Sequence, residues 1–175
     1  MTLMQEAPVR PDYAAMATNR LEGGDPFAVA EATPARLAEA VAGLTPEQLR
    51  RPEAPGKWSV LEVVQHLADY DLVNGYRFRM VLAHDTPPIQ GYDQDLWAGR
   101  LRYRDVPLDA ALAQFAALRD ANLRLLRTLL PAEWERVGLH AERGPESVRR
   151  MFELMAGHDL VHLDQIARIR RATGA

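Results

Sequence analysis

The sequence predicts an all-α protein, a four-helix bundle with one long crossover connection. Long segments repeat apolar residues at intervals of three and four, which places them on one face of a helix. No segment sustains the alternation of polar and apolar residues that marks a half-buried strand. One connection, residues 85–106, is longer than antiparallel neighbours need, so it can join two consecutive helices that run parallel.

The N-terminal segment is expected to lie outside the bundle. Residues 1–24 mix proline, glycine and polar residues and end in Gly23 and Gly24. This composition is typical of an extended arm with at most one short helical turn. We therefore divide the chain into an arm over 1–24 and a bundle over 25–175.

The first bundle helix carries two start signals. The pattern becomes helical at Asp25, and Thr33 followed by Pro34 is typical of an N-cap with proline in the first turn. The apolar stripe of this helix continues through Leu37, Val41 and Leu44. A second threonine–proline signal predicts one further short turn over 45–49.

Three more long helices follow from start and stop signals. A serine–glutamate capping box begins the second helix, expected over about residues 59–84. Prolines bound the third helix, expected over about 107–130, and the last helix begins at Pro145 or Ser147. The link 134–147 between these two helices indicates a short β-hairpin.

Three histidines lie on the inward-facing seams of two of these helices. His158 and His162 are four residues apart, so they stack on one face of the last helix. Their seam is otherwise made of Met151, Met155, Gln165 and Ile169. His66 lies on the apolar seam of the second helix. Two imidazoles one turn apart, with a third from a facing helix, can hold one metal ion.

Each histidine can also be an ordinary core or boundary residue, and a pair four residues apart arises by chance. Burying an unpaired imidazole costs about 1–3 kcal/mol, so three on inward seams are best explained by a shared ion. Three protein ligands leave a coordination position open for water, a substrate or a thiolate. Imidazole ligands suit Zn, Ni, Fe(II) and Cu alike, so the sequence does not name the metal.

Other polar residues near these histidines are candidates for supporting roles. Tyr70 can place a hydroxyl near the ion and Gln165 can line the pocket, although both can equally be packing residues. His140, in the link before the last helix, either reaches the pocket mouth or is an ordinary loop histidine. The nearest carboxylates either orient the ligands or are solvated surface groups, and we favour the surface interpretation for Asp69, Asp159 and Asp164.

The composition excludes several classes of protein. The absence of cysteine excludes disulfides, thiolate metal ligands and cysteine nucleophiles. The 21 basic and 24 acidic residues give a formal net charge of −3, which offers no electrostatic reason to expect nucleic-acid binding. The N-terminus lacks a signal-peptide pattern, and no stretch is apolar enough to span a membrane. We therefore expect a cytoplasmic protein with neither nucleic acid nor membrane as a partner.

Two blocks of the sequence resemble the DinB-like superfamily, which includes the YfiT-type metal-dependent hydrolases and the bacillithiol transferases. The blocks are GKWSVLEVVQHLADYD and GHDLVHLDQIARIR, and the resemblance covers about residues 25–172. It implies an up-down-down-up four-helix bundle, often a homodimer, with a nickel, zinc or iron ion. Carried over by position, the metal ligands are His66, His158 and His162. The related mycothiol-dependent maleylpyruvate isomerases typically have glutamate where this chain has His158, which favours the hydrolase or bacillithiol branch.

We therefore expect a metal-dependent enzyme. The preferred hypothesis is a transferase that joins a small-molecule thiol to an electrophile, in detoxification or the stress response. The alternatives are a hydrolase at the same three-histidine site and a non-enzymatic, stress-associated bundle. The expected partners are the thiol and the electrophile, and the expected assembly is a homodimer.

Overall fold

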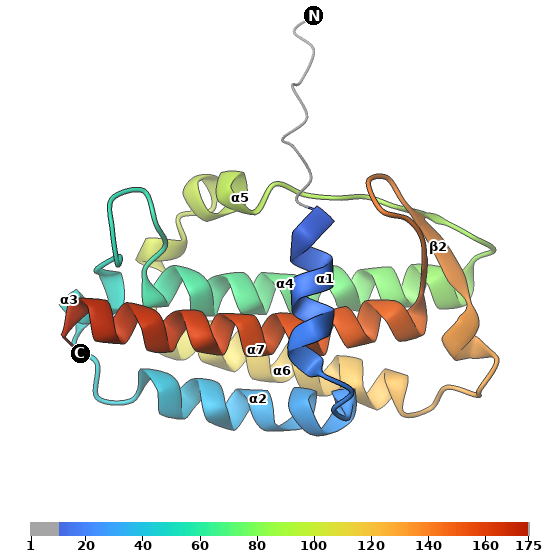
Figure 1. Cartoon of the computed structure of the whole chain (residues 1–175), viewed down its shortest axis with the longest axis horizontal. Coiled ribbons are helices and arrows are strands. Elements are labelled where there is room, and N and C mark those ends of the chain that lie inside the picture. Colours follow the sequence, from blue (N-terminus) through green and yellow to red (C-terminus); the bar gives the residue numbers. More distant parts are fainter. Residues whose placement is uncertain (1–10, 175) are drawn as a thin grey trace, which may run out of the picture.

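Four long helices form the bundle in the computed structural model, which describes residues 11–174. They are α2 (Pro26–Val41), α4 (Val60–Ala83), α6 (Leu108–Leu126) and α7 (Val148–Thr173). Figure 1 shows α4 and α6 running in one direction and α2 and α7 in the other. The predicted up-down-down-up bundle is thus confirmed, with the long crossover joining the parallel pair. Within the described part of the chain, no helix is long and apolar enough to cross a membrane.

The helix starts follow the capping signals in the sequence. At α4, the Ser59 hydroxyl accepts from the Glu62 backbone N–H at 3.4 Å. The Glu62 carboxylate accepts from the Ser59 N–H at 2.7 Å, which completes the capping box. The same reciprocal pattern begins the short helix α3 (Pro46–Arg50), where the sequence predicted one short turn. Ser147 caps α7, which decides between the two predicted starts of the last helix.

The start of α2 differs from the prediction. Its N-cap is Asp25, so Thr33 is not a cap and Pro34 lies inside the helix. A proline there has no N–H to donate to the carbonyl of Ala30, four residues earlier. Arg119 of α6 donates to that carbonyl instead, at 3.0 Å. The lost backbone hydrogen bond is thus replaced by a buried side chain, and the helix continues past the proline.

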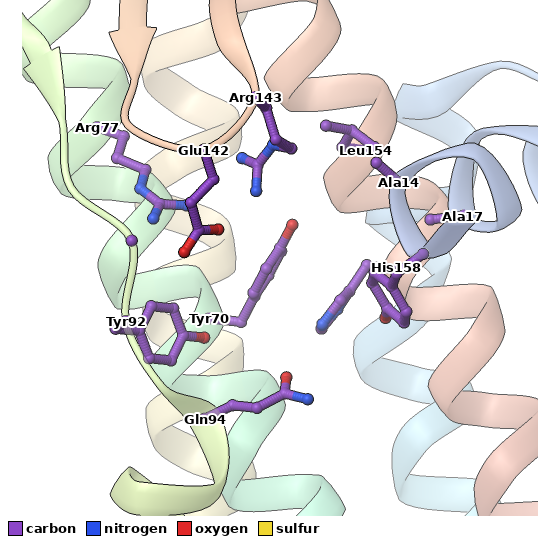
Figure 2. Close-up of a pocket in the computed structure, with 12 residues that line it drawn as sticks. Ala14, Ala17, Tyr70, Arg77, Tyr92, Gln94, Glu142, Arg143, Leu154 and His158 are labelled. Atoms are coloured by element: carbon purple, nitrogen blue, oxygen red, sulfur yellow. The ribbon is translucent and has the colours of Figure 1, made fainter. Parts of the chain in front are cut away.

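The expected arm contains a helix. α1 (Pro11–Leu21) crosses the middle of α7, so an extended segment was the wrong prediction for these residues, while 1–10 lie outside the described residues (Figure 1). The crossing depends on Gly157, because a Cβ there would overlap the carbonyl oxygen of Ala17. One face of α1 lines a pocket beside His158 (Figure 2). A helix this short is stabilised mainly by such packing, so its own sequence carries little signal.

The links between helices carry a small three-stranded sheet. β2 (Val137–His140) and β3 (Gly144–Ser147) form the predicted hairpin, and β1 (Pro88–Ile89) of the crossover pairs parallel with β2. A strand as short as β1 leaves no alternation to detect in the sequence. Three short helical segments complete the links: α5 (Gln94–Arg100), η1 (Tyr103–Asp105) and η2 (Glu133–Glu135).

The core consists of two apolar clusters with a polar layer between them. One cluster includes Leu67 and Ile166, together with Leu49 from α3. The other includes Phe78 and Met155, together with side chains from the sheet side of the bundle. Along α7, His158, Asp159 and His162 lie between the members of the two clusters, and buried polar side chains of α4 and α6 meet them there. The bundle therefore surrounds its polar site with apolar side chains on both sides.

Candidate metal centre

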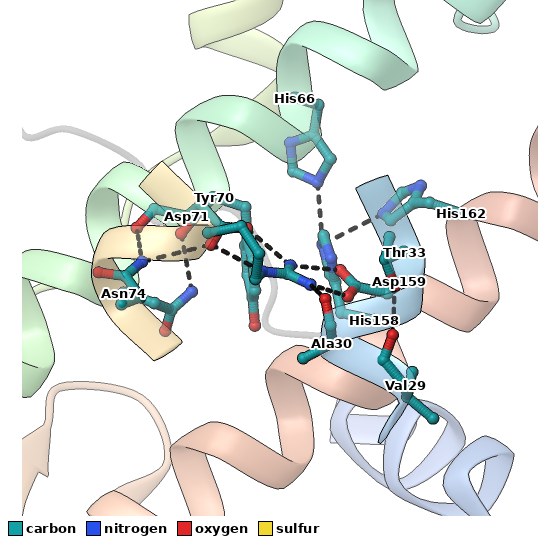
Figure 3. A network of polar contacts seen from close by, with 12 residues as sticks. Val29, Ala30, Thr33, His66, Tyr70, Asp71, Asn74, His158, Asp159 and His162 are labelled. Carbon is teal, nitrogen blue, oxygen red and sulfur yellow. Dashed lines mark hydrogen bonds and ion pairs between the residues drawn. The ribbon is translucent and has the colours of Figure 1, made fainter. Parts of the chain in front are cut away.

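The three seam histidines converge on one point between α4 and α7 (Figure 3). The Nε2 atoms of His66 and His158 lie 3.0 Å apart. The Nε2 atom of His162 lies 3.2 Å from that of His158. All three rings are buried, and one nitrogen from each lies within 4.8 Å of the others. The helical spacing thus places three imidazole nitrogens where one ion can contact all of them.

Burial keeps the three imidazoles neutral. It lowers the pKa of His66 and of His158 well below the usual value, and neighbouring histidines lower both further. Burial also lowers the pKa of His162, to about 4. A neutral imidazole keeps a lone pair that can bind a metal, whereas an imidazolium has none. Three nitrogen lone pairs are therefore available to a metal ion near neutral pH.

Gln165 orients one of these rings and does not line the pocket. Its Oε1 atom lies 2.7 Å from Nδ1 of His162. A proton on Nδ1 leaves the lone pair on Nε2, which faces the other two histidines. The Nδ1 atoms of His66 and His158 have no hydrogen-bond partner among the described residues. Gln165 thus does for His162 what a carboxylate or carbonyl does for many metal-binding histidines.

Aromatic rings enclose the histidines. Tyr70 stacks on His158, with the ring centroids 3.6 Å apart and the planes 7° apart. Trp58 packs against His66, with centroids 4.8 Å apart. Figure 2 shows the Tyr70 hydroxyl directed toward the Arg143 side of the pocket. Tyr70 therefore contributes its ring to the centre and its hydroxyl to the neighbouring pocket.

Tyr13 is a residue of the centre that the sequence did not reveal. Its hydroxyl lies 3.3 Å from Nε2 of His162, and its ring meets His158 edge-on with centroids 6.0 Å apart. Burial raises the pKa of Tyr13, so its hydroxyl stays protonated and can donate a hydrogen bond. Only the crossing of α1 over Gly157 brings this tyrosine to the histidines, and no local motif marks it.

The carboxylates that flank the histidines in sequence form no hydrogen bond with them. Asp164 is exposed and pairs with Arg20 at 2.8 Å, in agreement with the surface interpretation. Asp69 and Asp159 are buried, so the same interpretation was wrong for them. Asp69 accepts a hydrogen bond from the Tyr103 hydroxyl at 2.6 Å, which ties the crossover to α4.

Asp159 belongs to a buried ion-pair network beside the centre (Figure 3). Arg119 of α6 donates to Asp159 at 2.5 and 2.9 Å. The same guanidinium donates to Asp71 of α4 at 3.0 and 2.7 Å. The three side chains are no more than 1% exposed. Since Asp159 directly follows His158, this network fixes the histidine-bearing turn of α7 against α4 and α6.

A pocket of about 140 Å³ opens beside His158 (Figure 2). It lies between α1, α4, α7, the crossover and the turn of the hairpin. Besides His158, its polar wall consists of Tyr13, Tyr70, Arg77, Tyr92, Gln94, Glu142 and Arg143. A water molecule takes up about 30 Å³ in the liquid, so the pocket can hold a small organic group next to the histidines.

His140 lies apart from the three histidines. It is buried in β2 and is not among the residues that line the pocket. Its Nδ1 atom accepts from the Glu142 backbone N–H at 3.2 Å. Burial, and next the charge of Arg143, lowers the pKa of His140 to about 4. These contacts give His140 a place in the hairpin and none in the centre.

The lowered pKa of His140 predicts a pH dependence of stability. An unfolded histidine takes up a proton near pH 6.5, whereas the folded ring resists it down to about pH 4. Its contribution to stability is therefore fully present above pH 6.5 and is lost as the pH falls toward 4. Urea unfolding of the wild type and of His140→Gln at several pH values should give a flatter stability profile for the variant. Parallel profiles would contradict the contribution assigned to His140. The control is His84→Gln, because His84 is exposed.

The fold and the cluster together define a helical bundle with a buried three-histidine site. The sequence model of the DinB superfamily matches residues 30–166, so this chain belongs to that superfamily.

Several relatives carry the same functional name. A protein of Oceanobacillus iheyensis is 32% identical over 136 residues, 78% of each chain, and is named "Putative metal-dependent hydrolase". A protein of Bacillus licheniformis with that name is 33% identical over 143 residues, 81% of each chain. YfiT of Bacillus subtilis, also so named, is 30% identical over 144 residues, 80% of this chain and 81% of its own.

A solved structure shares the fold. The structure of YfiT from Bacillus subtilis matches with a TM-score of 0.79 and 26% identity, covering 97% of this chain and 93% of that chain. It is described as "a probable metal-dependent hydrolase with an unusual four-helix bundle topology". The likeness extends over the whole bundle and includes α1, which lies before the residues that match the family.

Proposed function

We propose that this chain is a metal-dependent enzyme whose ion is held by His66, His158 and His162. The observation that carries the proposal is the convergence of three buried, neutral Nε2 atoms. Around a tetrahedral ion with bonds of ~2.0–2.1 Å, ligand nitrogens lie roughly 3.3 Å apart. The separations of 3.0 and 3.2 Å in this protein are close to that value. Ni, Zn and Fe(II) all accept imidazole ligands of this kind.

Three protein ligands leave room for a small molecule at the ion, as in catalytic sites. A divalent ion bound there supplies a Lewis acid that favours the ionised form of a nucleophile. The protein's own residues set up the rest of the site. Gln165 fixes the tautomer of His162. The ring of Tyr70 stacks on the ring of His158 and holds it in place. The protonated hydroxyl of Tyr13 is placed to donate a hydrogen bond to an oxygen of the substrate.

The first candidate reaction is hydrolysis, with water as the nucleophile. The names of the relatives favour this reaction. In this reaction, water gives a proton to solvent or a base and forms a bond to the electrophilic atom. The leaving group departs with the bonding electrons.

The second candidate is thiol transfer to an electrophile, as the family resemblance implies. The pocket beside His158 favours it, because that space can seat an organic nucleophile as well as water. The thiol loses its proton, its sulfur bonds to the electrophilic carbon, and the leaving group departs with the electron pair. A small thiol and an electrophile would then be the two substrates, with detoxification or the stress response as the setting.

One set of assays separates these reactions. The protein is loaded with Ni, Zn or Fe(II), and activated esters and alkylating electrophiles are offered with and without a small thiol. Saturable turnover without thiol supports hydrolysis, and turnover that requires thiol supports transfer. Samples treated with a chelator should lose either activity. Stoichiometric metal binding with no saturable turnover of any of these substrates would favour the non-enzymatic bundle.

A further inference from the structure

Arg77 is a buried cation in the pocket wall. Its side chain comes from α4, two turns beyond Tyr70, and is 7% exposed. One nitrogen, Nη2, donates to the carbonyl oxygen of Gln90 in the crossover at 2.7 Å. The Nε atom is buried and has no hydrogen-bond partner among the described residues. None of the ion pairs found in residues 11–174 includes Arg77.

Such an arrangement is costly for a protein without a ligand. A guanidinium removed from water normally acquires a carboxylate or a full set of hydrogen-bond acceptors. Arg119, which is also buried, has two carboxylates. A single carbonyl oxygen compensates Arg77 only in part, so its charge is available to a group that enters the pocket.

Of the two arginines that line the pocket, Arg77 is the one without a carboxylate partner among the described residues. Arg143 also lines the pocket, but it binds Glu146 with two hydrogen bonds, at 2.6 and 2.8 Å. Glu142 is exposed and brings a negative charge to the rim of the pocket. The hydroxyl-bearing rings of Tyr70 and Tyr92 complete a wall that suits a flat polar group.

We propose that the pocket binds the carboxylate of an organic acid through Arg77, so that the substrate of the proposed enzyme is an anion. A planar guanidinium and a planar carboxylate match in geometry and can form two parallel hydrogen bonds. The other end of the acid then lies toward His158, on the opposite side of the pocket (Figure 2). That the end near His158 is the one that reacts rests on the proposed function, whereas carboxylate binding at Arg77 does not.

Benzoate and benzamide provide a matched pair of probes. They have the same shape and differ in charge, and their affinities can be measured by titration calorimetry on protein that has been incubated with Ni, Zn or Fe(II). The wild type should prefer benzoate by at least about ten-fold, the equivalent of about 1.4 kcal/mol. Arg77→Gln should remove most of that preference, and Arg77→Lys should keep part of it. Glu142→Gln should strengthen benzoate binding, because a like charge leaves the rim.

Arg79→Gln is the matched control. Arg79 lies on the same helix but binds the carbonyl of Gly75 and does not line the pocket, so its variant should keep the wild-type preference. Equal affinities of the wild type for the two probes, or an unchanged preference in Arg77→Gln, would overturn the proposal. Should Arg77→Gln not fold, a Glu142→Gln variant with unchanged or weaker benzoate binding would also overturn it.

The same samples separate this proposal from the proposed function. Their metal content is measured before each titration. A wild type that binds no metal but prefers benzoate through Arg77 refutes the metal-dependent enzyme and supports the carboxylate site. A wild type that binds metal but shows no such preference supports the centre and refutes the carboxylate site.

Discussion

Replacing Arg119 by methionine is expected to lower the free energy of unfolding by about 3–5 kcal/mol, the cost of leaving buried charges without their partner. The variant keeps Asp71 and Asp159 in the core with no cation between them. It also removes the donor that replaces the missing proline hydrogen bond at Ala30. Urea unfolding followed by circular dichroism at neutral pH measures the loss.

Two further variants test the physical reason. Arg124 lies on the same helix as Arg119, but its ion pair with Asp120 is exposed. Arg124→Met should therefore change the free energy of unfolding little. A triple variant that combines Arg119→Met with Asp71→Asn and Asp159→Asn should be more stable than Arg119→Met alone, because no carboxylate stays charged. A loss of less than about 1 kcal/mol in Arg119→Met would show that the network is not the tie between helices that its burial indicates.

Replacing His162 by alanine is expected to reduce metal-dependent turnover by at least about a hundred-fold, because an ion contributes several kcal/mol to such reactions. The variant removes one of the three proposed ligands, and with it the ring that Gln165 and Tyr13 both contact. Steady-state rates with a fixed metal concentration measure the effect. His84→Ala, at the exposed end of α4, should keep wild-type rates.

A variant of the supporting residue refines this prediction. Gln165→Ala keeps all three proposed ligands but frees the His162 ring, so metal affinity should fall about 10–100-fold while added metal restores turnover. Unchanged turnover in His162→Ala would place the reaction elsewhere in the molecule.

The long helices could be predicted because each carries its own local signals. The capping box at Ser59 and the cap at Ser147 fix where α4 and α7 begin. The course of α2 past Pro34 could not be predicted, because the replacement hydrogen bond comes from Arg119, eighty-nine residues away. The helix α1 depends in the same way on a distant contact, the close crossing at Gly157.

The three histidines of the candidate site could be predicted for a similar reason. His158 and His162 share a seam because of helical periodicity alone, and His66 faces them from the inward seam of α4. The buried charged residues could not be predicted, because a charged residue in an amphipathic helix usually marks the solvent-facing side. Asp159, Arg119 and Arg77 become recognisable only when the fold shows what surrounds them.

The most direct test of the metal centre is elemental analysis of the untagged protein beside a His158→Ala/His162→Ala double variant. We expect about one Ni, Zn or Fe ion per chain in the wild type and none in the folded variant. A wild type that holds no metal even after reloading, or a double variant that keeps it, would contradict the assignment of His66, His158 and His162 as the ligands.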